Sequence, residues 1–574
     1  MRKLSILALL FLLALPLSLF AQAEPDANPA TQELYALFAE KDTLERQERN
    51  GRHFPDVSVE AQEQRAAARR DLLRKLNNID RDDLSRADHI NADIFRFILE
   101  DEIAYVDFQA YLIPFNAEGG FYNRMRPGRW YRSADDYARY HERLQAFVDY
   151  LQANMQLMQK GLETGFVAPR VTAKNYEVLT APYRSADAAE NPLFQPYREQ
   201  PAGMADEAWA EVVRTGEAII REEVLPAYAA LHTFMQETYL PQARTTVGIS
   251  EVPNGKAYYE QRVQHYTTLD MTPQEVFDTG MREVARIRSE MEAIIEELEF
   301  DGAFADFLAF LRTDEQFYAT SPRDLLKEAS YYAKKIDGQL PQYFARLPRL
   351  TYGVEPVPAA IAPNYTGGRY SPGSARRNRA GEYWVNTYKL DSRPLYVLPA
   401  LTLHEAVPGH HLQMALAEEQ ENGPDFRRSY YISAFGEGWA LYGEYLGKEM
   451  GIYETPYEDF GRLTYEMWRA CRLVVDPGMH YLGWSREKAL DFLSTNTALS
   501  LHECNTEIDR YIGWPGQAVS YKIGELTIRR LRQEAEARMG DDFDLRTFHQ
   551  RVLENGSVPL FILEDLVRDL YENP

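Results

Sequence analysis

The chain has 574 residues, of which 45% are hydrophobic, and its formal net charge at pH 7 is −24. This size and hydrophobic content suffice for a large core, in two subdomains or more, and the acidic surface argues against nucleic acid or anionic lipid as a partner. The two cysteines, Cys471 and Cys504, are too few for a disulfide framework or a four-cysteine zinc site, and the sequence leaves open whether they pair.

Residues 1–23 have the three parts of a secretory signal. Two basic residues precede an apolar run that ends at Phe20, and Ala21-Gln22-Ala23 forms a small-residue cleavage site. A membrane anchor is the alternative, but the run is short and contains Pro16, and no cysteine follows it to carry a lipoprotein anchor. We therefore expect a periplasmic or secreted protein with no stable membrane insertion after the signal is removed.

Residues 24–270 are predicted to form an N-terminal helical region. Between residues 133 and 164, Tyr137, Tyr140, Leu144 and Phe147 begin a series of apolar residues at steps of three and four. This spacing places them on one face of a helix, so we expect that face to pack against neighbouring helices.

Residues 271–574 are predicted to form a second region, which carries the candidate chemistry. Thr272-Pro273-Gln274-Glu275 combines a capping box with a proline in the first turn, and so predicts the start of a helix. Farther on, prolines, glycines and alternating residues replace the helical stripes. Residues 352–357 and 382–387 are the best strand candidates there, and they predict a small sheet in a mainly α protein.

A histidine-rich segment follows the second strand candidate. It contains His404-Glu405 and, six residues after His404, the pair His410-His411. A zinc-hydrolase helix places two histidines four residues apart, because this spacing puts both rings on one face within reach of one ion. In a straight helix, a spacing of six would rotate the second ring ~120° away and raise it by ~9 Å.

The residues between the histidines allow the helix to depart from this regular geometry. Pro408 cannot donate a hydrogen bond to the carbonyl of His404, and Gly409 tolerates unusual dihedral angles. We expect a local bulge that moves His410 next to His404, with His411 as the alternative ligand. A buried helix with a satisfied histidine cluster is the structural alternative to a metal site.

A zinc ion held by two imidazoles needs a third protein ligand and an open position for water. The helical stretch over residues 433–450 offers two carboxylates, Glu437 between two glycines and Glu444 two turns later. Either can complete the site, and the other can support it as a hydrogen-bond partner.

The segment HEAVPGHH at residues 404–411 resembles the signature of the bacterial family known as domain of unknown function 885, which is similar to gluzincin-type zinc metallopeptidases. The segments FGEGWALY at 435–442, VDPGMH at 475–480 and RYIGWPGQAVSYK at 510–522 resemble it too. The resemblance covers most of the chain after the signal. It implies a large, mainly helical gluzincin-like fold with a small β-sheet beside the active-site helix, and Zn2+ held by His404, His410 and Glu437.

The resemblance also implies roles for other residues. Glu405 would be the general base, and Tyr521, Tyr511 or His480 would stabilise an oxyanion. Gluzincin-like folds place a strand beside the zinc helix, whose unpaired edge can bind an extended substrate; Asn386 would then anchor the substrate backbone. Arg510 and Lys522 are candidates for binding a substrate terminus.

Together these observations predict an exported zinc-dependent hydrolase that cleaves peptide bonds of short peptides by metal-activated water. Two alternatives remain. One is an esterase or amidase that acts on a non-peptide substrate, and the other is a non-catalytic periplasmic binding protein on a peptidase-like fold.

Overall fold

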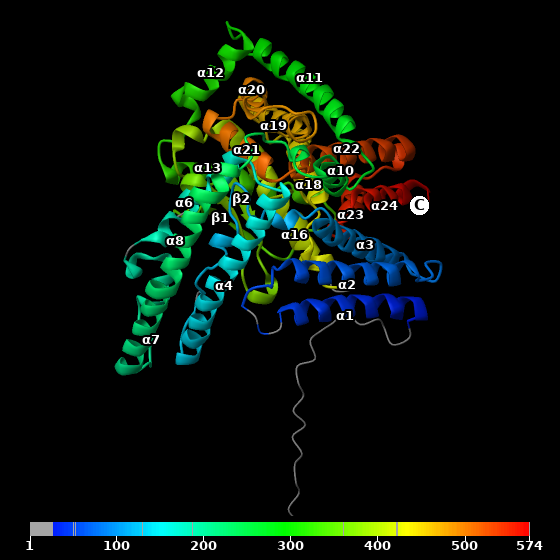
Figure 1. The fold of residues 1–574 in the computed structure, drawn as a ribbon. Helices are drawn as coiled ribbons and strands as arrows, with labels where there is room; N and C mark the ends of the chain where they lie inside the picture. Colours follow the sequence, from blue (N-terminus) through cyan, green and yellow to red (C-terminus); the bar gives the residue numbers. More distant parts are fainter. Residues whose placement is uncertain are drawn as a thin grey trace, which may run out of the picture.

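The computed structural model describes residues 27–572, apart from residues 50, 52, 129, 186, 360, 421 and 422. The expected signal segment, residues 1–23, lies outside the described residues. The fold is mainly helical with one three-stranded sheet, which confirms the predicted class at this level (Figure 1). In the part of the chain that is described, no helix has the length and apolar character needed to cross a membrane.

The first three helices form a layer of their own. They are α1 (Pro29–Arg49), α2 (Val59–Asn77) and α3 (Arg86–Asp107), and they lie side by side at one edge of the molecule (Figure 1). Leu34, Phe38, Leu72 and Phe95 are buried between them. Because α3 also contributes Ile94 to the large core, this layer is attached to the rest of the protein by apolar packing.

A helical arm projects from the body of the molecule (Figure 1). It is built from α4 (Ala134–Thr164) and a second helical stretch of α7 (Asp206–Ile219), α8 (Leu225–Thr233) and α9 (Leu240–Gln242), which π-helical turns join. The predicted apolar stripe of α4 is confirmed, since Tyr137, Tyr140, Leu144 and Phe147 are all buried in the core of the arm.

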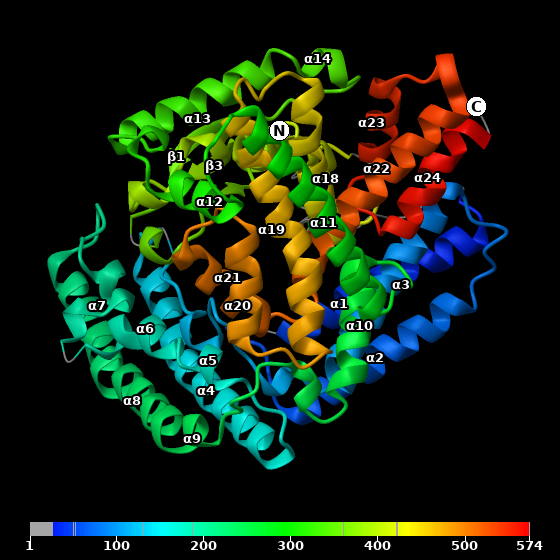
Figure 2. The ribbon, with the colours of Figure 1, turned by 90° about the horizontal axis from the view of Figure 1, so that it is seen from above.

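The largest core extends across residue 270, where we predicted a boundary between two regions. Helix α10 (Gly255–Thr267) contributes Tyr259, whose hydroxyl donates a hydrogen bond of 2.6 Å to Asp476 Oδ1 on α19 (Pro456–His480). The next helix, α11 (Pro273–Glu297), starts at the predicted capping box of Thr272 and Glu275 and runs alongside α19 (Figure 2). The boundary itself stays a prediction.

The sheet has the order β1-β3-β2, with β1 (Tyr352–Pro356) parallel and β2 (Gly368–Ser371) antiparallel to β3 (Gly381–Val385). Both predicted strands are confirmed as β1 and β3, whereas β2 was not predicted. Because β3 is the central strand, both of its edges are paired, so the expectation of an unpaired edge there is wrong. The outer strand that packs against the histidine-bearing helix is β2.

The other α-helices of the described residues complete the element order. They are α5 (Arg170–Ala173), α6 (Tyr176–Thr180), α12 (Phe304–Thr313), α13 (Pro322–Asp337), α14 (Leu340–Tyr343), α15 (Leu398–Glu405), α16 (His410–Glu418), α17 (Phe426–Ser429), α18 (Ser433–Glu449), α20 (Arg486–Asn496), α21 (Leu501–Gly513), α22 (Ser520–Met539), α23 (Leu545–Leu553) and α24 (Leu560–Glu572).

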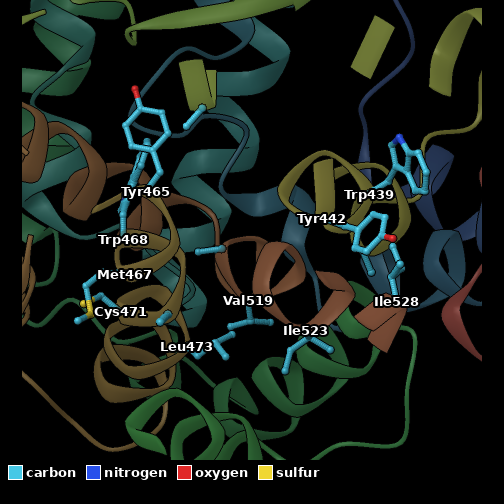
Figure 3. Close-up of a cluster of buried hydrophobic side chains, with 14 of the residues drawn as sticks. Trp439, Tyr442, Tyr465, Met467, Trp468, Cys471, Leu473, Val519, Ile523 and Ile528 are labelled. Atoms are coloured by element: carbon cyan, nitrogen blue, oxygen red, sulfur yellow. The ribbon is translucent and has the colours of Figure 1, made fainter. Parts of the chain in front are cut away.

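Helices α18 and α22 touch through glycines. A Cβ atom on Gly438 would lie 2.5 Å from the backbone of Gly524, and a Cβ atom on Gly524 would lie 2.0 Å from the carbonyl oxygen of Ala434. Around this crossing the two helices bury Trp439 and Ile523 among other large side chains (Figure 3). Because neither glycine has a side chain, the backbones of α18 and α22 come into direct contact. This contact fixes the position of α18 relative to α22.

We expect Gly524→Ala to destabilise the protein by about 1–3 kcal/mol, because the added methyl group overlaps the Ala434 carbonyl and forces the helices apart. Thermal unfolding followed by circular dichroism measures the effect. Gly338→Ala is the matched control, since its backbone is helical at φ −65 and its Cβ would meet no atom closer than 3.6 Å. Equal melting temperatures for the two variants would contradict the tight crossing.

Candidate metal centre

Three side chains from three helices converge at the centre of the C-terminal region. His404 Nε2 and His410 Nε2 lie 3.5 and 3.3 Å from the same oxygen, Glu437 Oε2. The potential ligand atoms of the three residues all lie within 4.8 Å of one another. They come from the end of α15, the start of α16 and the second turn of α18. We call this group the His-His-Glu cluster.

The chain achieves this convergence by ending one helix and starting another. Helix α15 ends at Glu405 and α16 begins at His410, so a complete break replaces the predicted bulge. The Val407–Pro408 peptide bond in the break is cis. A Cβ atom on Gly409 would lie 1.9 Å from the carbonyl oxygen of His404, so only glycine fits where the chain turns back.

The break brings the two predicted histidines together. The ring centroids of His404 and His410 are 4.8 Å apart and their planes are nearly perpendicular. Trp439 on α18 holds the turn in place, because its Nε1 donates a hydrogen bond of 2.8 Å to the carbonyl oxygen of Pro408. The same helix therefore supplies both Glu437 and a support for the loop between the histidines.

His411, the alternative ligand, points elsewhere. Its Nδ1 is 2.9 Å from the hydroxyl of Tyr370, and its Nε2 is 3.1 Å from the carbonyl oxygen of Leu350. Burial lowers the pKa of His411 to about 4, so the ring is neutral; it accepts from Tyr370 and donates to Leu350. Both nitrogens thus attach α16 to the sheet region, one to β2 and the other to the segment just before β1.

Glu444 supports the cluster from behind. His404 Nδ1 is 2.7 Å from Glu444 Oε1, which leaves the lone pair of His404 Nε2 directed at the cluster when the proton is on Nδ1. The guanidinium of Arg469 lies 3.6 Å from the same Glu444 oxygen. This arrangement makes Glu444 a partner of the ligand rather than a ligand.

Electrostatics tie the cluster together. Burial lowers the pKa of His404, but its hydrogen bonds to Glu437 and Glu444 outweigh this effect and raise the pKa to about 9. Burial raises the pKa of Glu437, but His410 and His404 together hold it well below its ordinary value. When no cation is bound, His404 therefore keeps a proton beside the ionised Glu437, and a metal ion would have to displace that proton.

The donor chemistry fits a metal ion. Two imidazole nitrogens and one carboxylate oxygen match the three protein ligands of a catalytic zinc site, which leaves one position for water. The histidines are only 2% and 6% exposed, so the donors are shielded from bulk solvent. Tyr431, which the sequence did not single out, donates a hydrogen bond of 3.0 Å to the other oxygen of Glu437.

Glu405 lies beside the cluster and has one oxygen free. Its Oε2 accepts a hydrogen bond of 2.7 Å from the backbone N–H of Tyr370 in β2. Its Oε1 has no hydrogen-bond partner among the described residues, and the side chain is nearly buried. The strand that we did not predict is thus the one that orients the predicted general base.

Comparison with known proteins shows which family the chain belongs to. The model of a family described as "Bacterial protein of unknown function (DUF885)" matches residues 43–567. The chain belongs to this family.

Two solved structures are similar to this DUF885 protein. One is described as "the putative lipoprotein from Colwellia psychrerythraea"; it has 27% sequence identity and a TM-score of 0.86, and the match covers 95% of this chain and all of the other. The second is described as "a putative lipoprotein of unknown function from Shewanella oneidensis"; it has 17% identity and a TM-score of 0.70 over 94% of this chain and all of the other, which shows a shared fold alone. The description of the Colwellia protein is compatible with the predicted export. No curated protein matches the chain.

Among the predicted oxyanion donors of the DUF885 protein, Tyr521 alone keeps a free hydroxyl. It is half-buried at the start of α22, with the guanidinium of Arg472 4.1 Å from its ring centre, and its hydroxyl makes no hydrogen bond to the residues that the structure describes. Burial, Glu437 and Tyr521 raise the pKa of Tyr431 well above its ordinary value, so the two tyrosines lie in one neighbourhood.

Tyr511 and His480 are engaged in the core. The Tyr511 hydroxyl accepts hydrogen bonds from Trp468 and Arg472 at 2.8 and 2.7 Å. His480 accepts from the backbone N–H of Ile249 at 3.0 Å and uses its second nitrogen on the Tyr511 carbonyl, also at 3.0 Å. These bonds occupy both side chains, so the placement argues against the predicted oxyanion roles.

Asn386 also serves the fold. Its Nδ2 lies 3.0 Å from each of three carbonyl oxygens, those of Ala362, Tyr365 and Thr366, and its Oδ1 accepts from the backbone of Tyr388. No donor remains for a substrate backbone. Asn386 therefore holds the loop before β2, contrary to the substrate-binding role that we expected.

The two predicted cations differ in exposure. Arg510 is half-buried and binds Gln517 at 3.0 Å and Glu507 at 3.4 Å, and its role in substrate binding stays a prediction. Lys522 is fully buried, with Nζ 2.8 Å from Glu466 and 2.7 Å from Glu525. A substrate has no access to Lys522, so its placement argues against the predicted role.

We expect Lys522→Met to lower the free energy of unfolding by about 3–5 kcal/mol, because Glu466 and Glu525 would be left buried without this cation. Thermal or denaturant unfolding measures the change. Lys327→Met is the matched control, since Lys327 pairs with Asp324 on the surface and its loss should cost at most about 1 kcal/mol. A stable Lys522→Met variant with a raised KM would instead restore the substrate-binding role.

Proposed function

We propose that this DUF885 protein is an exported zinc-dependent hydrolase that cleaves peptide bonds of short peptides. The observation that carries the proposal is the convergence of His404 Nε2, His410 Nε2 and Glu437 Oε2 from three helices, with the free oxygen of Glu405 beside them. The proposal includes a relationship to gluzincin-type peptidases. It is supported by the order of the site residues in the chain, in which a His-Glu pair is followed by a second histidine and then by a distant glutamate.

In this mechanism, His404, His410 and Glu437 would hold the ion. Zinc bound by such donors lowers the pKa of water toward neutrality and polarises a carbonyl group. Glu405 is oriented by the Tyr370 N–H on one oxygen, so its other oxygen can accept the proton of the attacking water. The same oxygen can then deliver that proton to the leaving amine.

The remaining groups would position the substrate and stabilise charge. Tyr521 has an unengaged hydroxyl that can donate to an oxyanion. Glu444 keeps the proton of His404 on Nδ1, which preserves the ligand nitrogen. Because these groups act on any planar carbonyl, the same site would also hydrolyse an ester or a non-peptide amide, and a substrate panel separates these activities from peptidase activity.

We expect the purified wild-type protein to contain about one zinc ion per chain, measured by elemental analysis. His410→Ala should lose the metal, because it removes one of three ligands. His411→Ala should keep it, since the two nitrogens of that ring bind Tyr370 and Leu350 and neither is directed at the cluster. A wild-type protein that stays metal-free after zinc is added, or a loss confined to His411→Ala, would contradict the assignment.

Glu405→Gln should retain zinc but lower kcat for peptide hydrolysis by about 10²–10⁴-fold, because the amide keeps the side chain's shape and cannot accept a proton. Release of a chromophoric product from a short peptide measures the rate. Glu355→Gln on the exposed face of β1 is the control and should leave the rate unchanged. Full activity in a zinc-loaded Glu405→Gln protein would exclude the general-base role.

A further inference from the structure

A cavity of about 330 Å³ lies beside α15 and carries features that the His-His-Glu cluster does not use. Its apolar wall includes Leu325, Val385, Tyr396, Leu398 and Leu401. All five side chains belong to the core and line the cavity with aliphatic and aromatic surface. A wall of this kind favours an apolar group of the size of one large side chain. We call this cavity the Arg393 pocket, after the cation described below.

The Arg393 pocket is one helical turn from the proposed general base. Leu398, Leu401 and Glu405 are spaced by three and four residues along α15, so they share one face of the helix. Gly367 also lines the pocket, three residues before Tyr370, whose N–H binds Glu405. One helical turn rises ~5.4 Å and one extended peptide residue spans ~3.5 Å, so neighbouring residues of one peptide can reach both places.

Arg393 is a cation in this pocket that no described carboxylate binds directly; the nearby Glu503 acts on it only through its charge. The side chain of Arg393 makes no hydrogen bond and no ion pair with any residue in the described part of the chain, and its Nε is buried without a partner. Thr464 on α19, only 1% exposed, lines the same pocket with a hydroxyl that also has no partner. Buried donors are nearly always satisfied in native proteins, so these two groups indicate a missing acceptor.

The charged residues that line the pocket favour a ligand with a single negative charge. Arg312 lines the pocket and donates to the backbone carbonyls of Leu499, Ser494 and Thr497, and none of the described carboxylates pairs with it. Lys389 and Arg393 add two cations, against Asp391 and Glu503. Glu503 also lacks a side-chain partner among the described residues, and burial raises its pKa to about 6 although Arg393 opposes the shift.

We propose that the Arg393 pocket receives the C-terminal residue of a peptide, with Arg393 binding its carboxylate and the apolar wall holding its side chain. A guanidinium with free N–H groups is the preferred protein partner of a carboxylate, and Thr464 can donate an additional hydrogen bond. The proposal rests on the proposed peptidase function. It adds the substrate class, peptides with a free C-terminus and an apolar last residue, cleaved close to that end.

Binding can be measured separately from turnover. The full-length chain carrying Glu405→Gln is titrated by calorimetry with two N-acetylated tripeptides that end in phenylalanine, one as the free acid and one as the carboxamide. We expect the acid to bind about 10–100-fold more tightly, which is the range of a hydrogen bond to a charged group. Adding Arg393→Gln should remove this preference, while Arg393→Lys should retain part of it.

Glu503→Gln provides the control of opposite sign. It removes a negative charge from the same pocket, so the acid should bind at least as tightly as before and the carboxamide should be unaffected. A general disturbance of the pocket would weaken both peptides in both variants. Equal binding of acid and carboxamide, or the same loss for both on Arg393→Gln, would overturn the proposal.

The two proposals fail separately. If the zinc-loaded wild-type protein cleaves the acid and the carboxamide peptides at equal rates, the peptidase function stands and the carboxylate pocket is rejected. If the Arg393-dependent preference for the acid is present but no peptide is cleaved, the pocket stands as a binding site and the peptidase function is rejected.

Discussion

The close contact of Gly409 with the carbonyl of His404 is the constraint on which the rest of the site depends. The chain must turn back within residues 406–409 for His410 to lie beside His404, and this turn leaves no room for a Cβ atom. Helix α18 is then held against the turn by Trp439, and against α22 by the glycine crossing. Glu437 is placed by these two contacts, so the third donor of the cluster depends on packing that lies outside it.

Buried charge surrounds the cluster, and nearly all of it is paired. Arg469 is close to Glu444, Arg472 binds Glu507, and Lys522 binds Glu466. Such pairs contribute little net stability, but they require all partners to be present, and so they fix the helices relative to one another. The Arg393 pocket differs, because among the described residues neither Arg393 nor Glu503 makes a side-chain hydrogen bond or ion pair there.

The sequence predicted what depends on local pattern or on donor chemistry. The stripe of α4 and the pairing of His404 with His410 follow from spacing and from the proline and glycine between the histidines. The sequence did not separate Tyr511, His480 or Lys522 from site residues, because most of their partners are far away in the chain; the backbone N–H of Ile249, for example, binds His480 across 231 positions. Residues 368–371 were missed as a strand because the segment is four residues long and begins at the second glycine of the pair Gly367-Gly368.

Asn386 shows how a residue outside the chemistry can matter to it. Its side chain holds the carbonyls of Ala362, Tyr365 and Thr366, and its backbone N–H binds the carbonyl of Gly367 at 2.9 Å. The loop held in this way leads directly into β2, whose Tyr370 orients Glu405, while Gly367 forms part of the wall of the Arg393 pocket. The general base and the pocket are therefore positioned by one buried amide, so their separation along the substrate is set by the fold rather than by either site.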